Sequence, residues 1–190
     1  MAIITTYGDL RRLYPYLTDE SRARVATRVK GAPKPLALCG HMLPANLNEI
    51  TFGQLTELQT AANADDAILA TARALFPTIT ADDMERVNVF VACGFLQWVG
   101  KEVERINKLW DGLRVKHTPQ EIMAGAEKLN FGTFGVLDWY AKRQGITDQD
   151  EVNNIAWVRL YACMKQDNER AMYERRLNNI YMSNLNKKKK

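Results

Sequence analysis

The chain has 190 residues, of which 46% are hydrophobic, and a formal net charge of +4. This length and composition suit one domain with a real core, with or without appendages. We expect no membrane span, because no apolar run approaches the roughly 20 residues required. Residues 1–7 also lack the pattern of a secretion signal. Three widely spaced cysteines (Cys39, Cys93 and Cys163) favour reduced thiols and an intracellular site of folding.

The charge is unevenly distributed along the chain. Residues 1–34 carry seven Lys/Arg against three Asp/Glu, and residues 156–190 carry nine against three. The middle, residues 35–155, carries ten against sixteen and is therefore acidic. Two basic ends around an acidic middle favour self-association or an acidic partner, and they allow contact with nucleic acid.

The first part of the chain predicts a helical appendage over residues 1–31, followed by an irregular arm or connector over residues 32–48. Thr18 is a good N-cap for a surface helix that continues to Lys30, and Gly31 stops it. The connector contains three of the six prolines, which interrupt regular structure. A helical body over residues 49–183 and a basic tail over residues 184–190 complete the predicted organisation.

The body is expected to consist of helices. Thr51 with Gln54 forms a capping box for one, and residues 65–76 predict a second. Thr80 caps a long helix, Ala81–Trp110, whose centre is apolar nearly all round and therefore typical of a buried core helix. Since no stretch shows the alternation of a strand, the sequence predicts an all-α multi-helix bundle with a long central helix.

The C-terminal half begins with the clearest local signal, Thr118-Pro119-Gln120-Glu121, which predicts a capped helix continuing to about Leu129. A second helix ends at Gly145, where a left-handed C-cap is expected. An acidic turn with Asp148, Asp150 and Glu151 then opens a tight helical corner. From Ala156 the chain predicts one long basic C-terminal helix toward Met182.

The corner over residues 131–157 has two interpretations. It is a packed helical corner, or it is a helix-turn-helix that reads DNA with its second helix. The three acidic residues at the start of that second helix oppose the DNA interpretation, because phosphates would repel them.

No catalytic or metal-binding constellation is present, so the chain is expected to be non-enzymatic and to bind no cofactor. Phosphate-binding glycine loops, zinc-protease motifs and nucleophile elbows are all missing from the sequence. Cys39 and His41 form the single close Cys/His pair, which supplies two of the four ligands of a structural zinc site. The adjacent carboxylates Asp65-Asp66 and Asp82-Asp83 are interpreted as helix caps.

Two groups of side chains are candidates for binding partners. The four tryptophans are core residues or interface anchors, and Trp139 and Trp157, with Phe131 and Phe134 from the same stretch, are the candidate partner-binding set. The basic residues near the C-terminus are a solvated face or a phosphate-binding surface. The candidate nucleic-acid-binding set is Arg170, Arg175, Arg176, Lys187 and Lys188.

Two stretches carry a family resemblance. Residues 43–58 read LPANLNEITFGQLTEL, and residues 135–173 combine Ala141-Lys142-Arg143-Gln144-Gly145 with EVNNIAW and a final helix. About half of the chain thus resembles small helical proteins of tailed bacteriophages, of the tail-assembly chaperone or minor virion protein type. The part of the connector before Leu43 and the basic tail are not part of this resemblance.

The resemblance implies a non-catalytic morphogenesis protein that binds other phage structural or tail proteins and forms a homo-oligomer. It implies action in the host cytoplasm during assembly, with or without retention in the virion, and an arm suited to threading onto a neighbour. The alternative hypothesis is a DNA-binding helical module that uses the 131–157 corner and the basic C-terminal helix.

Overall fold

The computed structural model describes residues 4–114, 117–129 and 131–188. Across these residues the chain is all-α apart from one small hairpin, as the sequence predicts. The chain divides into two compact units, Met1–Asn107 (unit 1) and Lys108–Lys190 (unit 2). The boundaries expected from the sequence, after residues 31, 48 and 183, describe a different division and stay predictions.

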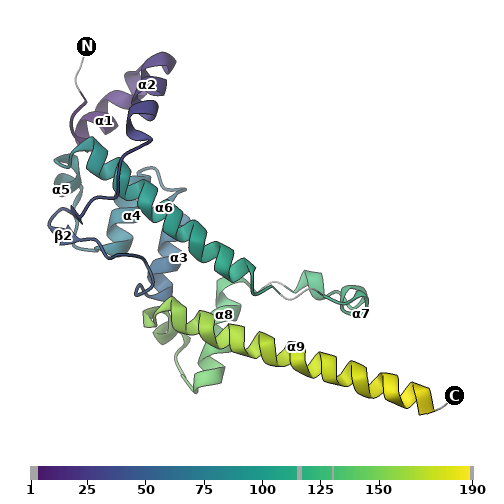
Figure 1. Ribbon diagram of the computed structural model, residues 1–190. Coiled ribbons are helices and arrows are strands. Elements are labelled where there is room, and N and C mark those ends of the chain that lie inside the picture. The colour runs from purple at the N-terminus through teal and green to yellow at the C-terminus, as the bar shows by residue number, and fades with distance from the viewer. Residues whose placement is uncertain (1–3, 115–116, 130, 189–190) are drawn as a thin grey trace. The chain divides into compact units, whose positions relative to one another are not determined.

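Unit 1 is built on helices α3, α4 and α6 (Figure 1). Phe95 of α6, Leu55 of α3 and Met84 are fully or almost fully buried and form the centre of its core. The Thr51 capping box is confirmed, since Thr51 Oγ1 accepts from Gln54 N and Gln54 Oε1 accepts from Thr51 N, both at 3.1 Å. The elements of unit 1 are α1 (Tyr7–Leu13), η1 (Tyr14–Tyr16), α2 (Asp19–Val29), β1 (Ala37–Leu38), β2 (His41–Met42), α3 (Phe52–Ala61), α4 (Ala67–Leu75), α5 (Ala81–Glu85) and α6 (Val89–Asp111), which continues into unit 2.

The expected single helix from Ala81 to Trp110 is wrong, because the chain leaves the helix between α5 and α6. Residues 87–89 pair instead with the segment before α1, where Tyr7 N donates to Val87 O at 2.8 Å and Val89 N donates to Thr5 O at 3.0 Å. The side chain of Asn88 then accepts from Phe90 N at 2.9 Å and starts α6. Backbone hydrogen bonds to a segment distant in the sequence therefore replace the hydrogen bonds that would have continued the helix.

Helix α1 is fixed to the rest of unit 1 by a buried polar contact. The Tyr7 hydroxyl donates to Asp66 Oδ1, which also accepts from Leu69 N at 2.9 Å and so caps α4. Burial, together with the neighbouring Asp66 carboxylate, raises the pKa of Tyr7, and the hydroxyl therefore stays protonated as a donor. Helix α2, by contrast, exposes at least part of every residue, as its sequence predicts.

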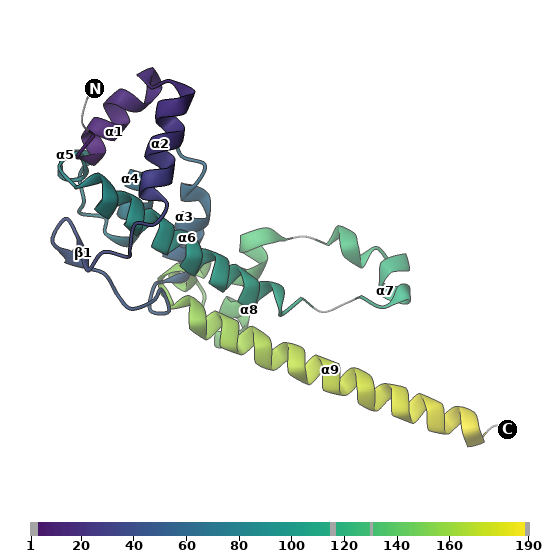
Figure 2. The same ribbon diagram turned by 45° about the horizontal axis from the view of Figure 1, so that its top comes forward.

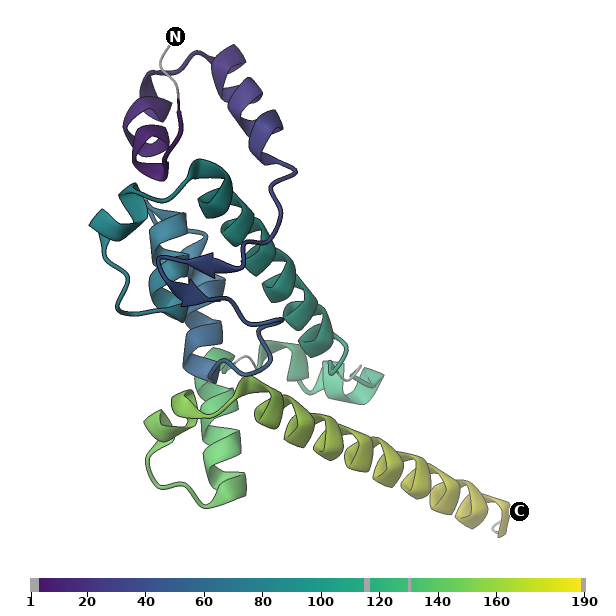
Figure 3. The ribbon, with the colours of Figure 1, turned by 60° about the vertical axis from the view of Figure 1, so that its left-hand side comes forward.

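The irregular segment after α2 packs against the helices of unit 1. It contains the β1–β2 hairpin, drawn as two arrows in Figure 3, whose His41 ring stacks on Phe76 at 4.8 Å. Near its end, Leu47 N donates to Glu102 Oε2 at 3.0 Å. The Pro33 carbonyl lies so close to α6 that a Cβ on Gly94 would be 2.2 Å from it. These contacts hold residues 32–48 against the helices of unit 1, so in this structure the segment does not extend away from them.

Unit 2 contains α7 (Pro119–Met123), η2 (Ala126–Lys128), α8 (Gly132–Gln144), η3 (Gln149–Asn154) and α9 (Trp157–Lys188). The Thr118 capping box is confirmed, with Thr118 N donating to Glu121 Oε2 at 2.8 Å. The expected continuation of this helix to Leu129 is wrong, because Gly125 takes a left-handed conformation with φ +85° and ends α7.

The corner between α8 and α9 differs from the one expected. Gly145 is left-handed as predicted, with φ +69°, and Ile146 N donates to Ala141 O at 2.9 Å. The acidic turn, however, forms the 3-10 helix η3 of six residues rather than a second α-helix. Helix α9 begins beyond it and continues past α8 to the C-terminal end of the described chain (Figure 2).

Candidate protein-binding surface of the C-terminal helix

The first half of α9 is anchored within unit 2. Trp157 and Leu160 are buried, and the Tyr161 ring makes edge contacts with Trp110 at 5.8 Å and Trp157 at 6.1 Å. Further along α9, Asn168 Nδ2 donates to Leu113 O at 2.7 Å. Arg143 at the end of α8 pairs with Asp167, which joins α8 to the same part of α9.

The second half of α9 carries apolar side chains that the described residues of unit 2 leave largely exposed. Tyr173, Ile180 and Tyr181 are each 57% exposed, and Leu185 is 54% exposed. With Leu177, which is half-buried, these five residues form the apolar stripe. Their spacings of three and four residues place them on one side of a helix. An exposed apolar face of this kind is a candidate protein-binding surface.

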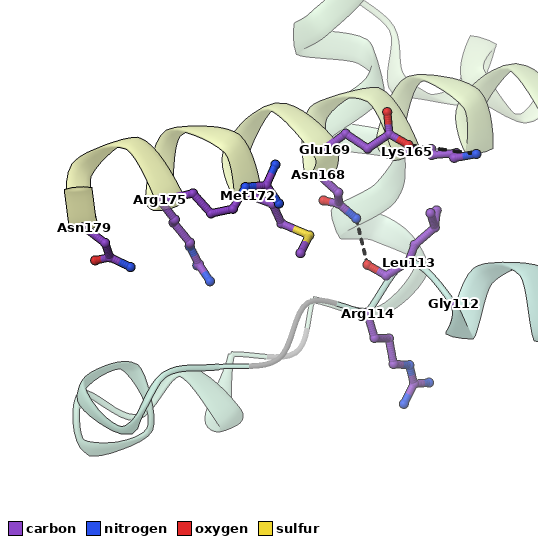
Figure 4. Close-up of a pocket in the computed structure, with 10 residues that line it drawn as sticks. Gly112, Leu113, Arg114, Lys165, Asn168, Glu169, Met172, Arg175 and Asn179 are labelled. Carbon is purple, nitrogen blue, oxygen red and sulfur yellow. Dashed lines mark hydrogen bonds and ion pairs between the residues drawn. The ribbon is translucent and has the colours of Figure 1, made fainter. Parts of the chain in front are cut away.

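A second feature, the basic groove, lies between α9 and residues 112–114, which follow α6 (Figure 4). Its volume is about 560 Å³. Leu113 and Met172 give it apolar walls, and the hydrogen bond between Asn168 and Leu113 crosses it. The groove is lined by Gly112, Leu113, Arg114, Lys165, Asn168, Glu169, Met172, Arg175, Arg176 and Asn179.

Most of the cations of the basic groove already have carboxylate partners. Arg175 Nη2 lies 2.6 Å from Glu121 Oε1, and Lys165 Nζ lies 3.9 Å from Glu169 Oε1. The Thr118 backbone N–H and the Arg175 guanidinium both help to lower the pKa of Glu121, which keeps this carboxylate charged. Arg176 has no carboxylate partner within the described part of the chain. The groove therefore offers little uncompensated positive charge.

The candidate partner-binding residues do not share one environment. Phe131 and Phe134, at the start of α8, are 69% and 63% exposed and are available to a partner. Trp139 is half-buried, with its ring in edge contact with Tyr140 at 5.9 Å. Trp157 is 1% exposed, so it is a core side chain rather than the surface anchor proposed from the sequence.

The candidate nucleic-acid-binding residues lie along the second half of α9. Arg170 pairs with Glu174 at 3.2 Å, so its charge is partly compensated, as that of Arg175 is. Helix α9 extends to Lys188, but the side chains of Lys187 and Lys188 lie outside the described residues.

Two of the three cysteines lie in environments that disfavour thiol chemistry. Burial raises the pKa of the Cys39 thiol and of the Cys93 thiol, which disfavours the reactive thiolate. Among the described residues, no three His, Cys, Asp or Glu side chains lie close enough together to hold a metal ion. No helix within these residues has the length and apolarity that crossing a membrane requires.

Comparisons with protein-family models, curated proteins and solved structures give no match to this chain. The candidate surface therefore rests on its own geometry. The sequence analysis did not predict an exposed apolar face formed by Tyr173, Leu177, Ile180 and Tyr181. Their spacing of three and four residues was the available signal.

Proposed function

We propose that the chain is a non-enzymatic morphogenesis protein of a tailed bacteriophage. It acts as a tail-assembly factor or as a minor structural component of the virion, in the host cytoplasm during assembly. It binds other phage proteins, and copies of itself, through the helices of unit 2. The phage assignment rests on the resemblance of residues 43–58 and 135–173 to such proteins, and the binding mode rests on the structure.

The apolar stripe is the observation that carries the binding mode. A helix segment without packing partners is marginally stable in water, because most helical stability in proteins comes from burying an apolar face. Ile180 and its neighbours leave such a face open over the last turns of α9. A partner helix or groove that covers the stripe supplies the missing burial.

The test uses an N-terminally tagged chain captured from phage-infected cells that produce it. Ile180→Ser removes an apolar side chain from the stripe, and Met182→Ser is the matched control on another side of the same turn. The two side chains are 57% and 59% exposed, so neither change creates a buried cavity. We expect phage structural proteins to be captured by the wild type and by Met182→Ser, and to be lost with Ile180→Ser. Recovery of no particle protein by the wild type would contradict the proposal.

DNA binding is the second candidate function. Four cations surround one groove, Arg114, Lys165, Arg175 and Arg176, although three of them pair with carboxylates. The shape of the 131–157 corner argues against DNA binding at that site. The 3-10 helix η3 is too short to serve as a recognition helix, and it exposes Asp148, Asp150 and Glu151.

This second function predicts affinity for a DNA duplex that falls steeply between 50 and 200 mM salt, as phosphate contacts require. It also predicts weaker binding after the double change Arg175→Ala and Arg176→Ala, with Arg24→Ala on α2 as the control cation. Absent or salt-independent binding would exclude it.

A further inference from the structure

We propose that the partner of the apolar stripe is the stripe of a second copy of this chain, with the two α9 helices antiparallel. The two-fold axis passes between residues 178 and 179. This inference rests on the proposed function, for which it names one partner and one binding geometry.

Three residues of the stripe, together with Asn184, have the spacing of a two-helix seam. Tyr173, Leu177, Ile180 and Asn184 follow one another at intervals of four, three and four residues, as the inward positions of paired helices do. Tyr181 and Leu185 flank this seam on one side. The last 20 residues of α9, from Glu169, span about 30 Å, which is long enough for the four layers of side chains.

The antiparallel arrangement makes the seam complementary to itself. Around an axis between residues 178 and 179, Leu177 meets Ile180 of the second copy, and Tyr173 meets Asn184 of the second copy. Each contact occurs twice, because a two-fold interface uses the same patch on both chains. The Tyr173 hydroxyl and the Asn184 amide form a hydrogen-bonding pair at each outer layer. On the flank, the Tyr181 hydroxyl comes near the Glu174 carboxylate of the second copy.

Charge disfavours the parallel alternative. In a parallel pair with the same seam, Arg170 faces Arg170 of the second copy at an inward position. The flanking Glu169 also comes beside Glu174 of the second copy, which adds a second repulsion between like charges. The antiparallel arrangement separates Glu169 from Glu174. It places Arg170 opposite position 187, also a cation, one layer beyond the seam, so the glutamates distinguish the two orientations.

The area of the stripe limits the surface that the contact can bury. Burying the exposed parts of its side chains on both copies removes on the order of 900 Å² of surface, which lies below the standard size of a specific interface. The pair is therefore a weak dimer, suited to assembly in which many copies add their contacts.

Sedimentation velocity of the full chain from 1 to 200 μM is the first test. We expect the wild type and Met182→Ser to shift from monomer to dimer with increasing concentration. We expect Ile180→Ser to stay monomeric over this range. A monomeric wild type at 200 μM would overturn the inference. Equal dimerisation of all three chains would also overturn it, because the stripe would then not be the contact.

Cysteine cross-linking tests the orientation, in a background with Cys39→Ser and Cys163→Ala. Tyr173→Cys chains and Asn184→Cys chains are oxidised separately and as an equal mixture. The antiparallel pair predicts a disulfide in the mixture between unlike chains. Like chains stay unlinked, because the two Tyr173 positions are about 16 Å apart along the helices and a disulfide needs Cα atoms within about 7 Å. Cross-linking within each single variant would show a parallel pair and overturn the inference.

These outcomes separate the inference from the proposed function. A monomeric chain that loses its captured phage proteins on Ile180→Ser overturns self-pairing but retains assembly binding through the stripe. A dimer that captures no phage protein supports self-pairing and contradicts the phage proposal.

Discussion

The close approach of residue 33 to α6 makes a sharp prediction for Gly94→Ala. A Cβ at this position would lie 2.2 Å from the Pro33 carbonyl oxygen, a separation that real Cβ atoms do not reach. The obstacle is backbone, and the flanking Val29 and Lys34 hold it in place. Val29 O accepts from Gln97 Nε2 at 2.7 Å, and Lys34 Nζ lies 4.4 Å from the centre of the Trp98 ring. The segment therefore moves away only by giving up these contacts.

The magnitude follows from two opposing effects. Overfilling a packed site costs about 1–3 kcal/mol, and the upper end applies here because backbone must move. Alanine regains about 1 kcal/mol over glycine through helix propensity. We therefore expect Gly94→Ala to lower the free energy of unfolding by about 2 kcal/mol. Gly100→Ala is the control in the same helix, since nothing lies within 4 Å of its Cβ. It should gain up to about 1 kcal/mol.

The assay is urea and thermal unfolding followed by circular dichroism, with the two variants and the wild type at one concentration. The predicted difference between Gly94→Ala and Gly100→Ala, about 3 kcal/mol, corresponds to about 6–12 °C in the melting temperature of a chain of this size. Equal stability of the two variants would refute the close packing of residue 33 on α6.

Three further predictions concern single residues of the two units. Tyr7→Phe should lower the free energy of unfolding by about 1.5–3 kcal/mol, because the Asp66 carboxylate loses a hydrogen bond; an unchanged urea midpoint would argue against this contact. Gly145→Ala should cost about 1 kcal/mol through its left-handed conformation and Gly145→Asn less, and equal melting temperatures for these two variants would count against the C-cap. The hydrogen bond from Arg105, assisted by Leu47 N–H, holds the pKa of Glu102 below its ordinary value, so its contribution to stability is present above about pH 4.3 and is lost as the pH falls through the folded pKa. Urea midpoints between pH 2 and 6 should therefore fall less steeply for Glu102→Gln than for the wild type, and identical slopes would contradict this assignment.

Local signals were the part of the fold that the sequence could predict. Thr51, Thr118 and Gly145 act on residues within four positions of themselves, so their neighbours in the sequence are sufficient to identify them. The break before α6 could not be found in this way. It depends on hydrogen bonds between Thr5–Tyr7 and Val87–Val89, about 80 residues apart, and each half of the broken helix has good helical sequence by itself.

The candidate surface shows the same limit for side chains. Aromatic residues are enriched both in cores and at interfaces. Residue type alone therefore cannot show that Trp157 is buried and Phe131 is exposed. To predict that the stripe on α9 is exposed, one must know where the helix extends beyond its contacts with the rest of unit 2. That position is set by tertiary contacts such as the one between Asn168 and Leu113.

The most direct test of the proposed function is quantitative mass spectrometry of particles and assembly intermediates, separated on a gradient from phage-infected cells that make this chain. The proposal predicts a fixed copy number in mature particles for a structural component. For an assembly factor, it predicts presence in intermediates and absence from mature particles. A chain found in neither fraction, although abundant in the infected cell, would contradict a role in particle assembly.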